Sequence, residues 1–139
     1  MSVRTWVRYA WAAPASAVGL VLAAPAVLLN MAHIARHDGA LEITLRNRSR
    51  PIRAVLDKLP FAAITFGHVV VAVSPQAQRL LRSHERVHVA QYERLGPLFL
   101  LAYPAESLLQ WLRGRRPYVD NRFEVEARRR SRPRAAQDA

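Results

Sequence analysis

The chain of 139 residues contains no cysteine, which excludes disulfide bonds and thiolate metal ligands. Any bound metal must therefore be held by histidine, aspartate or glutamate. Lysine is nearly absent too, because Lys58 is the only one, yet lysine and arginine together number 21 against 10 acidic residues. The net charge of +11 is thus almost wholly arginine, which suits anionic lipid headgroups or nucleic acid as partners.

Charged side chains are also missing from residues 9–32, where Ser16 and Asn30 are the only clearly polar side chains. About 24 residues of helix reach about 36 Å, which is enough to cross a bilayer core of about 30 Å. Two tryptophans and a tyrosine cluster at the start, as aromatic side chains do at a membrane interface. The stretch predicts a membrane-anchoring helix, with a cleaved signal peptide or a buried core helix as the alternatives.

Arginines on both sides of this stretch indicate its orientation. Arg4 and Arg8 precede it, and more arginines follow soon after it, at positions 36, 46, 48 and 50. Because cytoplasmic loops carry the excess of positive charge, this distribution favours a cytoplasmic location for the C-terminal part.

The remainder of the chain predicts an α+β fold. After a turn at Asp38-Gly39, residues 41–46 alternate between apolar and polar, which is typical of a half-buried strand. Residues 64–73 are rich in β-branched side chains and almost wholly apolar, which predicts a buried strand. That strand leads directly into a helix, which begins with a capping serine and a proline at Ser74-Pro75 and ends at Gly96-Pro97.

Two further helices are expected near the C-terminus. Residues 97–112 are apolar and predict a core helix or a helix lying along a membrane surface. Asp120-Asn121 offers an N-cap for a last helix near residues 122–130, whereas residues 47–51 read as a basic turn. We therefore expect a small β-sheet and a central helix packed against C-terminal helices. The parts of the chain are then a membrane-anchoring segment over 1–36, an α+β domain over 37–127 and a basic disordered tail over 128–139.

Residues 84–88 read H-E-R-V-H and match the pattern H-E-x-x-H of zinc metallopeptidases. On a helix, His84 and His88 share one face, and Glu85 lies on the neighbouring face, where it can hold a metal-bound water. The alternative is a pair of hydrogen-bonded core histidines. The two histidines belong to a stripe of helical spacing that we expect to be buried, made of Leu80, His84, Val87, His88, Gln91 and Leu95.

A catalytic zinc ion usually takes three protein ligands and one water, so a third ligand must come from elsewhere. Each acid among the candidates has another interpretation, since Glu124 can form a capping box with Asn121 and Glu126 can be a solvated helix acid. His68 can be a hydrogen-bonded core histidine, and the two earlier histidines can be polar residues near the membrane. The candidates are Glu124, Glu126, Asp120, Glu106, His68, His33 and His37.

Two stretches carry a resemblance to known proteins: HERVHVAQYERLGPLFLLAY from residue 84, and YVDNRFEVEAR from residue 118. Together they resemble a group of small, largely uncharacterised bacterial membrane proteins, which are similar to minimal members of the gluzincin class of zinc metallopeptidases. The resemblance covers roughly residues 83–128. It implies that His84 and His88 are zinc ligands and that Glu85 is the catalytic base.

The third ligand of gluzincins is a glutamate on a later helix, often within E-x-x-A-D. The resemblance therefore implies Glu124 as that ligand, because residues 124–127 read E-V-E-A, and leaves Glu126 as the alternative. One position departs from the class, since Arg128 stands where an aspartate steadies a histidine ligand. Arginine cannot accept an imidazole N–H, so Asp120 or a backbone carbonyl would have to replace the aspartate.

These features together predict a zinc-dependent hydrolase that cleaves peptide bonds of a peptide or protein substrate at the inner membrane of a bacterium. His68 or Tyr118 is a candidate donor to the oxyanion, and the strand over 64–73 is a candidate partner for an extended substrate. One alternative is a non-catalytic membrane protein with a structural or relic metal site. Another is a basic module for membrane surfaces or nucleic acid, but the sequence lacks the interleaved aromatic and basic residues that nucleic-acid binding favours.

Overall fold

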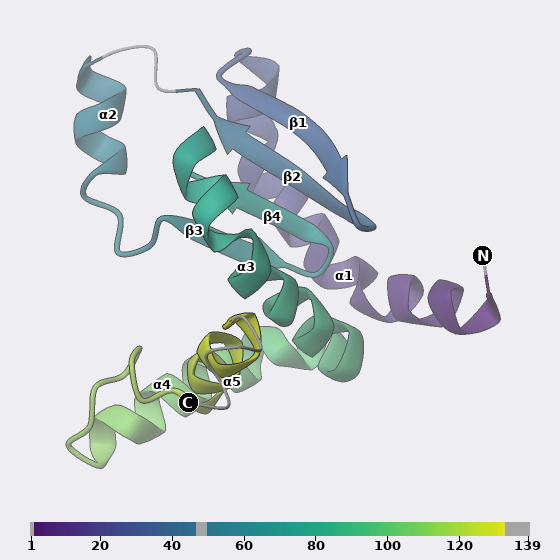
Figure 1. The fold of residues 1–139 in the computed structure, drawn as a ribbon, viewed down its shortest axis with the longest axis vertical. Helices are drawn as coiled ribbons and strands as arrows, with labels where there is room; N and C mark the ends of the chain where they lie inside the picture. The colour runs from purple at the N-terminus through teal and green to yellow at the C-terminus, as the bar shows by residue number, and fades with distance from the viewer. Residues whose placement is uncertain (1, 47–49, 133–139) are drawn as a thin grey trace.

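The computed structural model describes residues 2–46 and 50–132, and it confirms the α+β class. Figure 1 shows the β-sheet between long helices, with the C-terminal helices beyond it. The elements in chain order are α1 (Val3–Leu28), β1 (Ala32–His37), β2 (Ala40–Leu45), α2 (Arg50–Leu56), β3 (Ala63–Phe66), β4 (Val69–Ala72), α3 (Pro75–Leu95), the 3₁₀ turn η1 (Gly96–Leu98), α4 (Phe99–Leu112) and α5 (Arg122–Ser131).

The sheet has the strand order β1-β2-β4-β3, in which only the central pair β2 and β4 is parallel. The predicted strand over 64–73 is wrong as a single strand, because it folds into the hairpin of β3 and β4. Gly67 turns the chain there with a φ of +60°, and a Cβ at this position would lie 2.7 Å from the backbone oxygen of Ala12. A single glycine within an apolar run was too weak a signal for this turn. As a result β3 is an edge strand.

Two helices cover opposite faces of the sheet, which gives a three-layer arrangement with α1 behind and α3 in front (Figure 1). Helix α1 approaches closely through a stripe of small residues, since a Cβ on Gly19 would lie 2.8 Å from the Cβ of Phe66. On the other face Val89 of α3 packs against Ala40 and Val70. The small residues of the α1 stripe that are buried are Ala12, Ala15, Gly19 and Ala23.

Helix α1 is long and apolar enough to cross a membrane, although signal sequences and core helices also satisfy that test. It ends at Leu28, earlier than expected, because Asn30 takes a positive φ of 56° and the chain enters β1. The expected boundary at residue 36 therefore falls inside β1, and α1 is also one layer of the folded domain. Its outer side carries large exposed apolar residues, among them Val18, Val21 and Leu22.

Helix α3 begins and ends where its capping residues predict. The Ser74 hydroxyl accepts a hydrogen bond from the Ala77 backbone N–H at 3.0 Å, and Gly96 ends the helix with a φ of +59°. The expectation that Leu80 is buried is wrong, because its side chain is 72% exposed. Helix α5 meets α3 from His84 onward, about one turn beyond Leu80, so it does not cover this part of the stripe.

A cluster of aromatic rings joins α3, α4 and α5, and it packs against α1. The ring of Phe99 packs edge-on against Tyr92 at 4.5 Å and against Phe123 at 4.9 Å between centroids. Ala12 and Ala15 of α1 complete this cluster. Phe99 of α4 thus joins α3 and α5 through ring contacts.

Asn121 places the start of α5, as its predicted capping role requires. Its side-chain oxygen accepts from the Phe123 N–H at 2.9 Å, while its amide nitrogen donates to the Tyr103 carbonyl and the Ser107 hydroxyl. Helix α5 continues to Ser131, so the first residues of the expected tail are helical, and residues 133–139 lie outside the described part. The expected basic turn over 47–51 is corrected in part, since α2 begins at Arg50 and residues 47–49 are not described.

Candidate metal centre

Three side chains converge at the meeting point of α3 and α5: His84 and His88 from α3, and Glu124 from α5. The Nε2 atoms of the two histidines lie 3.2 Å apart. Nε2 of His84 lies 3.1 Å from Oε2 of Glu124, and Nε2 of His88 lies 3.2 Å from Oε1. These residues form a group that could hold a metal ion, with all three ligand atoms within 4.8 Å of one another.

The spacing of these atoms is compatible with a metal ion bound between the three side chains. With metal–ligand bonds of about 2.0–2.1 Å, the ligands of a tetrahedral zinc ion lie about 3.3 Å apart. The two histidine nitrogens lie 3.2 Å apart, and each lies 3.1 or 3.2 Å from a different carboxylate oxygen of Glu124. In addition, Oε2 of Glu124 is buried and makes no well-directed hydrogen bond within the described residues. A cation placed among the three side chains would complete the coordination of this oxygen.

Gln91 fixes the orientation of His88. Its amide nitrogen donates to the Phe123 carbonyl at 3.1 Å and to Glu126 at 2.9 Å, so its oxygen must be the atom that faces Nδ1 of His88. An amide oxygen only accepts, and Nδ1 therefore carries the proton of the neutral ring. This tautomer leaves the Nε2 lone pair directed at the centre of the group, as a metal ligand requires.

Glu124 is held as a carboxylate by its neighbours. Burial raises its pKa, but the contacts from His84, His88 and the Tyr103 hydroxyl outweigh burial and hold the pKa well below its usual range. The Tyr103 hydroxyl donates to Oε1 at 2.7 Å, and the Arg128 guanidinium lies 3.9 Å from Oε2. Glu124 therefore stays charged at neutral pH.

His88 responds to the same cluster in the opposite direction. Burial lowers its pKa, but the hydrogen bond with Glu124 and the nearby charge of Glu85 outweigh burial, so the pKa lies above its usual value. Without a metal ion, the cluster is therefore held together as an imidazolium–carboxylate pair at mildly acidic pH. A metal ion would have to displace that proton.

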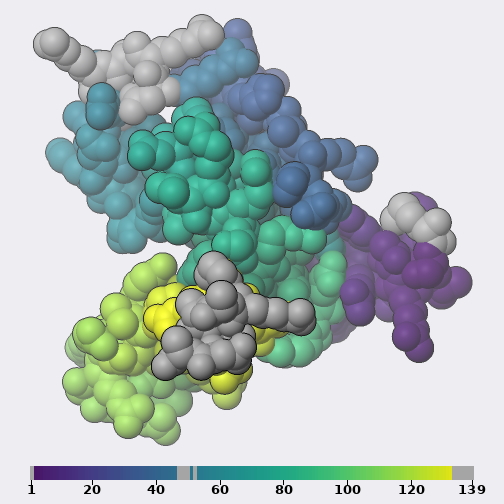
Figure 2. Space-filling model, in the orientation of Figure 1, coloured from purple at the N-terminus to yellow at the C-terminus, as the bar shows by residue number. Residues whose placement is uncertain are grey.

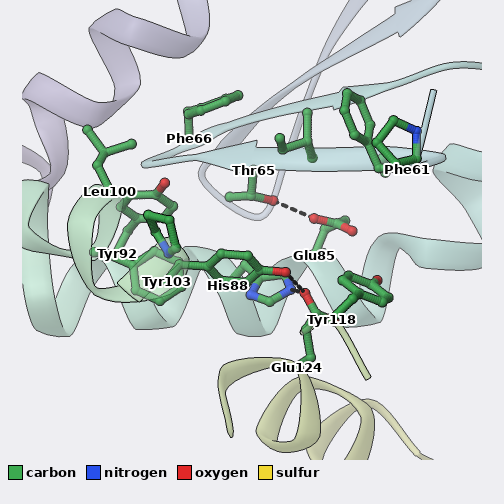
Figure 3. Close-up of a pocket in the computed structure, with 15 residues that line it drawn as sticks. Phe61, Thr65, Phe66, Glu85, His88, Tyr92, Leu100, Tyr103, Tyr118 and Glu124 are labelled. Carbon is green, nitrogen blue, oxygen red and sulfur yellow. Dashed lines mark hydrogen bonds and ion pairs between the residues drawn. The ribbon is translucent and has the colours of Figure 1, made fainter. Parts of the chain in front are cut away.

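Glu85 lies beside the group and faces a cavity of about 380 Å³ between β3, α3 and α4 (Figure 3). The Thr65 hydroxyl, from β3, donates to its Oε2 at 2.7 Å. His88, Glu124 and Tyr118 also line this cavity. Its other walls are mostly apolar and include Phe61, Ile64, Phe66, Leu100 and Pro104.

Comparisons with protein-family models, curated proteins and solved structures found no match for this chain. The chemistry of the site is inferred from the geometry of its own residues.

Glu126, the alternative ligand, lies outside the group. Its carboxylate accepts from Gln91 at 2.9 Å and pairs with Arg94 and Arg130. The capping-box interpretation of Glu124 is also wrong, because the Asn121 N–H donates to the Tyr118 carbonyl and Glu124 points to the histidines.

The remaining candidate ligands have other partners or lie elsewhere. His68 is buried at the turn between β3 and β4, bonded to Glu93 at 3.0 Å and stacked on Tyr9. Asp120 pairs with Arg116, and Glu106 accepts from Gln110. His33 and His37 lie exposed on β1, away from the group.

The position of Arg128 does not leave His88 without an acceptor. Gln91 supplies it, in place of Asp120 or a backbone carbonyl, and the Arg128 guanidinium donates to the Val119 carbonyl. Sequence reasoning placed Gln91 on the correct stripe but gave it no role, and it missed Thr65 and Tyr103 altogether. No spacing rule links these residues to Glu85 and Glu124, because the pairs are 20 and 21 residues apart.

Proposed function

We propose that this chain is a zinc-dependent hydrolase that cleaves peptide bonds at a membrane. The observation that carries the proposal is the convergence of His84, His88 and Glu124 beside Glu85, at the wall of a cavity. Two ligands and a base on α3, with a third ligand from α5, match the needs of metal-assisted hydrolysis.

Glu85 is the proposed general base. When bound, the zinc ion would act as a Lewis acid and lower the pKa of water to about 7. Glu85 accepts the proton of the attacking water and passes it to the leaving amine. The hydrogen bond from Thr65 occupies one carboxylate oxygen and leaves the other for this transfer.

Tyr118 is the proposed donor to the oxyanion that develops on the substrate carbonyl. It lines the cavity with Glu85 and Glu124. Burial and the charge of Glu124 raise its pKa to about 12, so its hydroxyl keeps its proton at neutral pH. His68, the other candidate donor, does not line the cavity; it is stacked on Tyr9 of α1 and bonded to Glu93.

The proposed substrate is an extended peptide or protein segment with an apolar side chain next to the cleaved bond. Edge strand β3 lies beside the cavity and offers one side of its backbone for pairing with such a segment. Phe61, Ile64 and Leu100 provide apolar walls for the side chain. Apolar pockets with a few polar groups are typical of sites that bind such side chains.

We further propose that α1 holds the protein in the inner membrane of a bacterium, with the remaining domain on the cytoplasmic side. The large exposed apolar residues on its outer side support this location, because lipid would cover apolar side chains that would otherwise face water. The excess of arginine after α1 supports the orientation.

A non-catalytic protein with a structural metal site is the second candidate. The Arg128 guanidinium beside Glu124 favours it, because a second cation near the ligand carboxylate weakens the hold on a metal ion. It predicts bound zinc without hydrolysis.

The test compares Glu85→Gln with the wild type, both purified in detergent as the full chain. We expect Glu85→Gln to retain zinc and to lose cleavage of a peptide library, because only the base is removed. Glu93→Gln is the matched control, since Glu93 lies on the same helix and contacts His68 and Arg8 instead of the cavity. Undiminished cleavage by Glu85→Gln would refute the mechanism, and a zinc-loaded wild type without any cleavage would favour the second candidate.

A further inference from the structure

Helix α4 has an outward face that is apolar and uncovered by the described part of the chain. Leu101 is 71% exposed, Trp111 62% and Leu112 68%, and Leu108 also faces outward. Their spacing of three, four and seven residues places them along one side of the helix. A monomeric protein in water rarely keeps such a row of large apolar side chains exposed.

The opposite side of α4 already serves the fold. Phe99 belongs to the aromatic cluster, Tyr103 donates to Glu124, and Glu106 and Gln110 are buried and bonded to each other. The outward leucines therefore contribute nothing to the core. Figure 2 shows the end of α4 and the connector after it (light green) as a lobe that projects beyond the sheet layers.

Positive charge follows this apolar face directly. Arg113, Arg115 and Arg116 come immediately after α4, next to Trp111. Within the described residues, Arg113 and Arg115 have no ion-pair partner, whereas Arg116 pairs with Asp120. Exposed leucines, a tryptophan and adjacent arginines are the combination that places a helix at an anionic membrane surface.

Helix α4 starts where α1 passes. Gly96 of η1 lies against Trp11 of α1, because a Cβ on Gly96 would lie 2.4 Å from that indole ring. The start of α1 also combines exposed tryptophan with arginine, at Trp6, Arg4 and Arg8. Exposed apolar side chains with a tryptophan and neighbouring arginines therefore occur on both α1 and α4.

We propose that the outward face of α4 lies in the headgroup region of an anionic lipid bilayer, as a second membrane contact beside α1. A second copy of the chain is the weaker occupant, because pairing this face would bring two arginine clusters together in a protein of net charge +11. Leu100, Tyr103 and Pro104 of α4 line the cavity at Glu85, so this contact would hold the cavity close to the lipid surface. The contact shares only its membrane location with the proposed function and does not require hydrolysis.

The absence of cysteine allows a direct test with single nitroxide labels on the full chain. Labels at Leu101→Cys and Leu108→Cys report on α4, Val55→Cys on exposed α2 is the water-facing control, and Val21→Cys on α1 is the lipid-facing control. The labelled proteins are placed in vesicles of phosphatidylcholine mixed with phosphatidylglycerol, because anionic lipid attracts polybasic segments. Spin relaxation then measures collision with oxygen, which concentrates in lipid, and with a nickel chelate, which stays in water.

We expect the labels on α4 to collide more with oxygen than with nickel, as the α1 label does, and the α2 label to show the reverse. We also expect the preference for oxygen on α4, but not on α1, to fall when phosphatidylglycerol is left out. High nickel collision on α4 would show a water-facing helix, and low collision with both reagents would show a protein-covered one; either result overturns the proposal. None of these spectra depends on zinc or on cleavage, so a failed membrane contact and a failed hydrolase are told apart.

Discussion

The side-chain oxygen of Gln91 lies 2.8 Å from Nδ1 of His88, one turn along the same helix. In the proposed metal site this contact would replace the aspartate that gluzincins carry at the position of Arg128, because it fixes the ring and its tautomer. The support for the ligand therefore comes from α3 itself, and an arginine at position 128 is compatible with a metal site.

Replacing Gln91 by alanine should weaken zinc binding about 10- to 100-fold, the usual effect of losing a partner behind a histidine ligand. The dissociation constant is measured by competition with a chelator. Gln110→Ala is the control, because Gln110 is also a buried amide but contacts Glu106 on α4. If Gln91→Ala folds and binds zinc as tightly as the wild type, Gln91 does not support His88 as a metal ligand.

The pH dependence of stability should differ between the metal-free and zinc-loaded chains. The pKa of His88 is higher in the folded chain than in the unfolded chain, where it is about 6.5. Protonated His88 therefore stabilises the metal-free fold at pH values below about 6.5, and this stabilisation is lost as the pH rises through the folded-state pKa. The pKa of Glu124 is lower in the folded chain than in the unfolded chain, where it is about 4.3. Ionised Glu124 therefore stabilises the fold at pH values above about 4.3, and this stabilisation is lost as the pH falls through the folded-state pKa. The pair thus contributes most between about pH 4.3 and 6.5.

Zinc should act in the opposite direction, because it binds the deprotonated imidazole. Thermal unfolding with a chelator and with zinc, from pH 5 to 8, gives the comparison. We expect the gain in unfolding temperature from zinc to increase with pH through the His88 titration. A gain that does not vary with pH would contradict a histidine-ligated metal.

Thr65→Val should leave zinc content unchanged and slow the reaction about tenfold, the effect of losing one hydrogen bond of roughly 1.4 kcal/mol to the base. Thr44→Val on β2 is the matched control, since Thr44 contacts Gln78. A rate equal to that of Thr44→Val would show that Thr65 does not position the base.

Gly19→Val should destabilise the folded domain by about 1–3 kcal/mol, because overpacking forces neighbouring elements apart. The added Cβ would lie 2.8 Å from Phe66 on β3. Ala17→Val, on the exposed side of the same helix, is the control and should have little effect. Equal stability of the two variants, measured by chemical unfolding, would mean that α1 is an anchor detached from the sheet.

The parts of the fold with local signals could be predicted from the sequence. Ser74, Gly96 and Asn121 cap helices through contacts within four residues, so each leaves a pattern in the chain. The turn at Gly67 was missed because its apolar flanks read as one strand, and α1 covers that turn from a distance in sequence.

The residues of the candidate site also differ in whether a local sequence pattern could predict them. His84, Glu85 and His88 follow from helical spacing, and Glu124 entered through the resemblance. Tyr103 reaches Glu124 from α4, and Gln91 reaches Phe123 across 32 residues, so their contacts follow from tertiary packing and not from local pattern. Leu80 illustrates the converse, since helical spacing alone could not say how far along α3 the next helix extends.

The zinc content of the purified full chain tests the metal site most directly. His88→Ala and Glu124→Ala each remove one proposed ligand, while Glu126→Ala removes a carboxylate of the same helix that contacts Gln91 and two arginines. The account predicts one zinc ion per chain in the wild type and in Glu126→Ala, and its loss in the other two variants. Equal zinc in all four proteins, or zinc lost only with Glu126→Ala, would contradict it.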